Sequence, residues 1–129
     1  MATVVTACNS GGNSNPTTYL PAGTYSLALT NPQPQNCPTT GGDIANAITS
    51  DGQGNLCVDA AGGDCQYINI ANNPCLISSG AASDVTLNST LSNCQLNSNG
   101  QFIAYMQASA TSPSDYVGCN YTLTLTPTP

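Results

Sequence analysis

The clearest structural signal in the sequence is "CNYTLTLT", residues 119–126, close to the C-terminus. Bulky or apolar residues alternate with polar ones along its whole length. The first set is Cys119, Tyr121, Leu123 and Leu125, and the second set is Asn120, Thr122, Thr124 and Thr126. Because successive side chains point to opposite sides of a strand, this alternation predicts a β-strand with one buried face and one exposed, hydroxyl-rich face.

The segment just before this strand completes a predicted hairpin. "GQFIAYMQASA", residues 100–110, is rich in apolar and β-prone residues. The turn-forming "TSPSD", residues 111–115, separates it from the last strand. Ser, Pro and Asp favour turns, so we expect an antiparallel pair at the C-terminal end of the fold.

Three segments further upstream also predict strands. They are "GTYSLALT" at 23–30, "QYINIAN" at 66–72 and "DVTLNSTL" at 84–91. Segments rich in Gly, Pro, Asn and Asp lie between them, and short strands separated by such turns are typical of sandwiches. The predicted fold class is therefore all-β: an Ig-like antiparallel β-sandwich stabilised by disulfides.

One segment favours a helix instead. In "GGDIANAITSDG", residues 41–52, Ile44 and Ile48 lie four residues apart, which places them on one helical face. Asp43 precedes them and is of a residue type that caps helices. We expect a helix of one or two turns here.

Charge is the most unusual property of the chain. Its 129 residues include no Lys, Arg or His, and the net charge is -6. All six acidic residues are aspartates: Asp43, Asp51, Asp59, Asp64, Asp84 and Asp115. Nucleic acids and anionic membrane surfaces are bound through Lys and Arg, so this composition excludes both as partners. Membrane insertion is not expected either, because no apolar run approaches the roughly 20 residues that cross a bilayer.

The cysteines predict a disulfide framework. There are seven, at unequal spacings: Cys8, Cys37, Cys57, Cys65, Cys75, Cys94 and Cys119. Zinc binding is not expected, because the chain has no His and no CxxC pair. Disulfides formed in an oxidising, extracellular compartment are the better interpretation. Six cysteines can close three bridges, and the remaining one stays free, lies buried or bonds to another chain.

Carboxylates are the only candidates for catalysis, because without His or Lys no base is present to activate a nucleophile. Asp51, Asp59 and Asp64 are close in sequence and would be the acid and base of a glycoside hydrolase. Asp51, Gln53, Asn55 and Asp59 are spaced loosely like a calcium loop, without the glutamate and helices of an EF-hand. Asp beside Gly is ordinary turn chemistry. The prediction is therefore no enzyme, no cofactor and no metal.

Two sequons offer attachment points for glycans. "NST" at Asn88 and "NYT" at Asn120 match the acceptor pattern for N-glycosylation. Plain strand surface is the alternative interpretation of both. The threonines of the last strand offer a further alternative, a flat ice-binding or lectin-like array, but they form a single row.

The N-terminal segment predicts a strand on a tether. "ATVVTAC", residues 2–8, is β-prone, and the Gly-, Asn- and Ser-rich 9–17 is a spacer. The chain divides into this arm and tether, 1–17, and one sandwich domain, 18–129. The arm either folds onto its own sheet or completes the sheet of a neighbouring copy through main-chain hydrogen bonds. No secretory leader is visible at the start, so we expect a mature secreted chain.

In this general plan the chain resembles the secreted pilus subunits of Ig-like fold that assemble by donor-strand exchange. The arm that carries the resemblance is Ala2, Thr3, Val4, Val5, Thr6, Ala7 and Cys8. The resemblance implies a structural subunit of an extracellular filament, a cell-surface appendage in which other copies of the chain are the partners. It also implies that Val4 and Thr6, or Val5 and Ala7, fill pockets of the neighbour. The chain departs from this family in having seven cysteines rather than one pair.

Two alternatives bear on the odd cysteine. If Cys8 bonds into a neighbouring copy, the helical homopolymer is covalently locked. A monomeric secreted adhesin or binding module, rich in disulfides, predicts instead that Cys8 pairs within its own chain and that the surface carries a concave or flat ligand patch.

Overall fold

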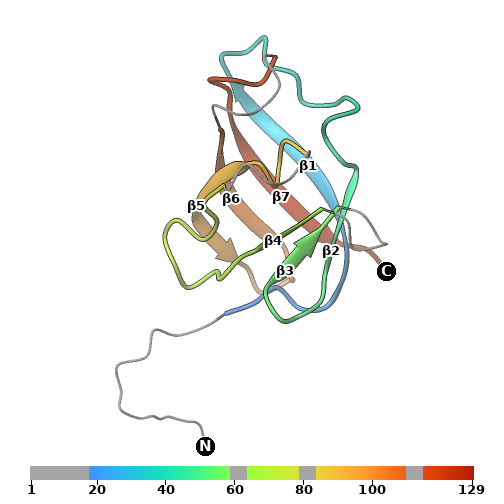
Figure 1. Cartoon of the computed structure of the whole chain (residues 1–129). Coiled ribbons are helices and arrows are strands. Elements are labelled where there is room, and N and C mark those ends of the chain that lie inside the picture. Colours follow the sequence, from blue (N-terminus) through green and yellow to red (C-terminus); the bar gives the residue numbers. More distant parts are fainter. Residues whose placement is uncertain (1–17, 59–63, 79–83, 110–114) are drawn as a thin grey trace, which may run out of the picture.

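The computed structural model describes residues 18–58, 64–78, 84–109 and 115–129. Seven antiparallel strands make up its regular structure (Figure 1). They are β1 (Gly23–Gln33), β2 (Ala47–Ser50), β3 (Asn55–Cys57), β4 (Cys65–Tyr67), β5 (Ser89–Leu96), β6 (Phe102–Ala108) and β7 (Asn120–Pro127). The predicted all-β class is confirmed.

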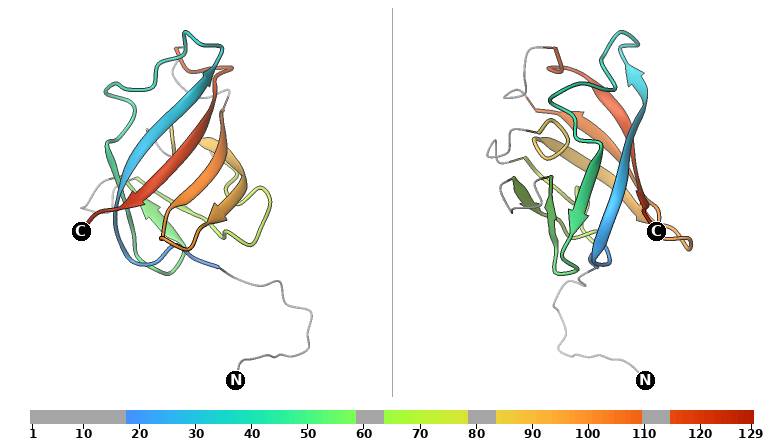
Figure 2. Two further views of the ribbon diagram at one scale, coloured as in Figure 1. Left: turned by 180° about the vertical axis from the view of Figure 1, so that it is seen from behind. Right: turned by 90° about the vertical axis from the view of Figure 1, so that its right-hand side faces the viewer.

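All seven strands belong to one curled sheet, in the order β4-β3-β2-β1-β7-β6-β5 (Figure 2). A division into two separate sheets, as in an Ig-like sandwich, is not seen among the described residues. The reason is β1, whose residues Gly23–Ser26 pair with β2 while its residues from Tyr25 to Gln33 pair with β7. One long strand therefore joins a long half, β1 with β5, β6 and β7, to a short half, β2 with β3 and β4.

The C-terminal prediction is confirmed in detail. The apolar set from Cys119 to Leu125 is buried, with Leu123 and Leu125 at 0% exposure, and the intervening polar residues are partly exposed. β6 pairs with β7 as expected, and Phe102 lies opposite Leu125. In the same way Tyr25 and Leu29 of β1 are buried.

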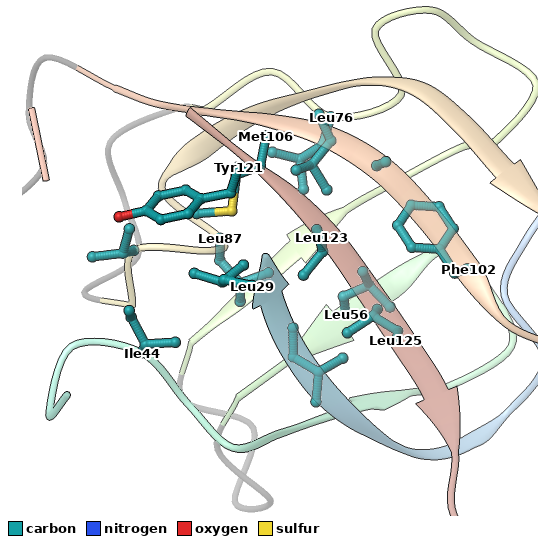
Figure 3. Packing of buried hydrophobic residues seen from close by; sticks show 14 of the residues in the cluster. Leu29, Ile44, Leu56, Leu76, Leu87, Phe102, Met106, Tyr121, Leu123 and Leu125 are labelled. Atoms are coloured by element: carbon teal, nitrogen blue, oxygen red, sulfur yellow. The ribbon is translucent and has the colours of Figure 1, made fainter. Parts of the chain in front are cut away.

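The core lies between the two halves of the curled sheet. Figure 3 shows Leu123, Leu125 and Phe102 of the long half packed close to Leu56 of β3. Each of these side chains is at most 1% exposed. The short half therefore covers the inner face of the long half, which gives the curled sheet the two layers of a sandwich without separating it into two sheets.

The predicted helix at 41–52 is wrong. Its first residues form a turn in which the Ile44 amide donates to the Gly41 carbonyl, and β2 follows. Ile48 is buried on β2. Pairing with β1 outweighs a weak local preference, because only two apolar residues supported the helix and isolated helices of this length are marginal.

Two of the predicted strands are only partly confirmed, one of them shifted along the chain and the other shortened. Of residues 84–91, only the end from Ser89 onward is strand, because Asp84–Asn88 forms a turn in which the Asn88 amide donates to the Asp84 carbonyl. Every side chain of this turn is buried, so the apparent alternation had no solvent face. Of residues 66–72, only Gln66 and Tyr67 belong to β4, and the next amide, of Ile68, donates to the carbonyl of Gly54.

Three disulfides close the fold. Cys37–Cys119 joins the connection after β1 to the start of β7, Cys57–Cys65 joins β3 to β4, and Cys75–Cys94 joins a loop to β5. Beside the last bridge, Leu76 pairs with Leu91 of β5. The predicted framework is confirmed, and it indicates an oxidising environment such as the extracellular space.

Candidate functional site

The predicted arm, Ala2–Cys8, and its tether lie outside the described residues. The first described residue, Thr18, is held beside the loop that follows β4. Its amide donates to Asn69 Oδ1 over 2.9 Å, and its carbonyl accepts from the Ile70 amide over 2.8 Å. The chain is therefore anchored from Thr18 onward, next to the edge of the short half.

The cysteine pairing has a direct consequence for Cys8. Six of the seven cysteines are joined to one another in the three bridges. Cys8 itself lies outside the described residues. Within a single chain, no cysteine is left with which it can form a disulfide.

Three aspartates surround a surface hollow of about 240 Å³ between the turn before β2 and the turn before β5. They are Asp43, Asp64 and Asp84. Asp84 Oδ2 accepts from the Ala45 amide over 2.7 Å, and Oδ1 accepts from the Thr86 amide over 2.8 Å. Burial raises the pKa of the Asp84 carboxyl, although these backbone hydrogen bonds oppose the shift. Asp84 thus stabilises two turns.

Nearby, Tyr116 is buried, and its pKa is raised first by that burial and then by the charge of Asp43. A phenol in this position stays protonated and supplies no base. In the part of the chain that the structure describes, no group of three His, Cys, Asp or Glu side chains is placed to hold a metal ion.

Of the carboxylates considered for catalysis or calcium, the two that the structure describes, Asp51 and Asp64, lie in different parts of the surface. Asp51 is exposed, and its oxygens accept from the amides of Gln53 and Asn55 and from the Asn55 carboxamide, at 2.7–3.1 Å. These bonds lower the pKa of Asp51, the one from the Asn55 side chain most of all. Asp59 lies outside the described residues, and Asp64 lines the hollow instead. The side chain of Asp51 therefore stabilises the turn between β2 and β3.

The two sequons differ in accessibility. Asn88 is 5% exposed, and its Oδ1 accepts from Ser78 Oγ over 2.5 Å and from Ser109 Oγ over 3.1 Å. The folded protein leaves little room for a glycan there. Asn120 is half-buried at the start of β7, on the side of the sheet that faces away from the core.

A further surface feature is the side of the long half that faces away from the core, here called the outer face. Its central residues come from β1 and β7: Ser26, Ala28, Thr30, Thr122, Thr124 and Thr126. The neighbouring strands extend it with Ile103, Tyr105 and Gln107 of β6 and Thr90 and Ser92 of β5. Figure 2 (left) shows these four strands side by side, with no described segment in front of them.

Register and hydrogen bonds organise the outer face into cross-strand rows. Ala28 lies opposite Thr124, which lies opposite Ile103, and Thr30 lies opposite Thr122, which lies opposite Tyr105. The hydroxyls of Ser26 and Thr30 each donate to a carbonyl of β7 over 3.4 Å. The single threonine row expected from the sequence is therefore one part of a broader surface, which also contains the exposed Tyr105.

A second exposed feature is a pair of tyrosines on the short half. The rings of Tyr19 and Tyr67 meet edge to face with centroids 5.9 Å apart, and their hydroxyls lie 2.8 Å apart. Tyr67 packs over Gly54, which has a φ of +100°. A Cβ at Gly54 would lie 2.5 Å from a ring carbon of Tyr67, so the pair depends on glycine there.

Comparison with known proteins assigns no family. No protein-family model matches the chain, no curated protein matches its sequence, and no solved structure matches its fold. The described residues form no helix that has the length and apolar character needed to span a bilayer. The candidate features are therefore the cysteine pairing, the acidic hollow, the tyrosine pair and the outer face.

Proposed function

We propose that the chain is a structural subunit of an extracellular filament, in which the arm Ala2–Cys8 adds a strand to the sheet of a neighbouring copy. The observation that carries this proposal is the cysteine pairing. Because six cysteines are used within the domain, a disulfide at Cys8 has to be made to another chain. An intermolecular bridge near a strand-exchange site would lock neighbouring subunits together.

The shape of the domain supports the same proposal. The sheet is open, with β4 at one edge and β5 at the other, and the chain enters the described part beside β4 at Thr18. Strand addition satisfies such edges with main-chain hydrogen bonds and needs no charged side chains. In this proposal the sheet becomes a complete Ig-like sandwich only with the arm of a neighbour. The cell-surface location and any glycan at Asn120 belong to the proposal too.

The alternative function is a monomeric secreted binding module. Its support is the exposed tyrosine pair, because aromatic rings at a surface are common in binding patches. It predicted that Cys8 pairs within its own chain, and the three bridges leave no cysteine for that. We therefore favour the filament.

The experiment is electron microscopy of negatively stained native protein together with non-reducing gels. We expect filaments, and a ladder of covalent oligomers that collapses to monomer with reductant. Deleting residues 2–8 removes the filaments, whereas Cys8→Ser keeps them and removes only the ladder. Filaments that survive the deletion overturn strand exchange, and native protein without filaments favours the binding module.

A further inference from the structure

We infer that the outer face is a second contact surface between copies of this chain, separate from the N-terminal strand and running side to side. This inference rests on the proposed function only in that copies meet in a filament. The contact itself is argued from the charges of the whole chain and from where the structure places them.

The first step is the absence of cations. With a net charge of -6 and no Lys, Arg or His, two copies repel each other, and no ion pair can form between them. A carboxylate that becomes buried in a contact between copies has no opposite charge to compensate its desolvation. Any stable contact between copies therefore has to exclude the aspartates.

The second step is the position of the aspartates. None of the four strands of the long half contains a charged residue. Asp43, Asp64 and Asp84 surround the hollow, while Asp51 and Asp115 lie in turns. Asp59 lies outside the described residues. The strands of the outer face thus contribute no carboxylate to it.

The third step is the chemistry of the outer face. Tyr105 is 41% exposed and lies between Ser92 and Thr122 of the neighbouring strands. Ala28, Thr124 and Ile103 form the next row of the face, so apolar area is available for contact. The hydroxyls of Ser26 and Thr30 already donate to carbonyls of β7, so burying them leaves fewer polar groups unsatisfied. A second copy of the same face therefore fits it without burying a carboxylate.

Size sets the expected strength of the contact. Four strands at about 4.8 Å spacing and a length of about eight residues give roughly 500 Å² on each copy. A pair of such faces buries roughly 1,000 Å², which is at the lower limit for a specific interface. A single contact is therefore weak, whereas many contacts repeated along two filaments hold them firmly side by side.

The test uses the full-length chain in sedimentation velocity at about 0.01 M and about 1 M NaCl, with microscopy of the same samples. Salt screens repulsion between the copies, so side-to-side association strengthens at the higher concentration. An interface built on ion pairs would weaken instead. Wild-type chains that show no side-to-side association at either salt concentration overturn the inference and leave a neutral ligand, such as a polysaccharide, as the occupant of this face.

Matched variants localise the contact. Thr124→Asp places a charge in the middle of the outer face, Gln53→Asp adds the same charge on the exposed turn after β2, and Thr124→Asn changes shape without charge. We expect Thr124→Asp to raise the concentration for half-association by about tenfold or more, because like charges then face each other. We expect Thr124→Asn and Gln53→Asp to stay near wild type. Equal behaviour of the two aspartate variants overturns the inference.

Microscopy separates this inference from the proposed function. Filaments that form but no longer lie side by side in Thr124→Asp support both proposals. Side-by-side filaments in this variant contradict the outer-face contact and leave strand exchange intact. Salt-dependent association that Thr124→Asp abolishes, in a protein that forms no filaments, supports the outer-face contact and contradicts strand exchange. Ala28→Asp repeats the test on the neighbouring strand.

Discussion

The long half and the short half bury the same core from opposite sides, yet different contacts hold them. The long half consists of strands of seven to eleven residues, and in it the first strand, β1, pairs with the last, β7. The short half consists of strands of three or four residues, tied by a turn, a local disulfide and the tyrosine pair.

The strands of both halves contain no charged residue, so charge is confined to the segments between strands. The long half carries the extended pairing and an uncharged outer face. Asp51 and Asp84 lie in turns, where their oxygens accept hydrogen bonds from backbone amides. These amide donors partly compensate the negative charge that no Lys or Arg side chain is present to neutralise.

The largest expected difference between the halves comes from their disulfides. Cys37–Cys119 spans 82 residues and Cys57–Cys65 spans 8. In the chain-entropy model, these loops correspond to about 4.5 and about 2.5 kcal/mol. We expect replacing Cys37 and Cys119 by alanine to lower the free energy of unfolding more than replacing Cys57 and Cys65 by alanine. Denaturant titrations measure both losses. Equal losses would contradict the expectation that the longer loop restricts the unfolded chain more than the shorter one.

A leucine from each half tests the packing. Leu123 of β7 and Leu56 of β3 are both at most 1% exposed. Leu123→Ala should cost about 4 kcal/mol, since long strands pair on both sides of β7 and restrict collapse around the cavity. Leu56→Ala should cost about 2 kcal/mol, because only the short strands β2 and β4 flank β3. Denaturant titration of both variants measures the difference. A larger cost at Leu56 would contradict the view that the short half relaxes more easily.

The smallest expected effect is in the dependence of stability on pH. Burial raises the pKa of Asp84 above its ordinary 3.8, so the folded state binds the proton more tightly, and stability falls as pH rises above 3.8 through the folded pKa. The pKa of Asp51 is lowered, so its contribution is present above 3.8 and is lost as pH falls through the folded pKa.

Asn variants separate the two effects. In thermal unfolding across acidic pH, Asp84→Asn should flatten the stability curve above pH 3.8, and Asp51→Asn should flatten it below that value. The second change should be the weaker one, because Asp51 is exposed and solvent screens it. If each variant altered the opposite range of pH, the assignment of the two environments would be wrong.

Much of the fold was predictable where a strand has one buried face and one solvent-exposed face. The alternation at Tyr25, Leu27 and Leu29 and along residues 119–126 identified β1 and β7 with the correct buried sides. Alternation of apolar and polar residues does not identify a strand where both sides of a segment are buried. Residues 85–89 are buried throughout, so alternation there carried no information about a solvent face.

Composition and local alternation were enough to define an all-β chain, its disulfide framework, its lack of Lys, Arg and His, and the threonine row on the last strand. These properties depend on residue types and on neighbours within a few positions. The pairing of Cys37 with Cys119, the neighbours of Asp84 and the outer face depend on which strands lie side by side. That arrangement arises because β1 pairs with both β2 and β7, and burial of a shared core stabilises this long-range pairing.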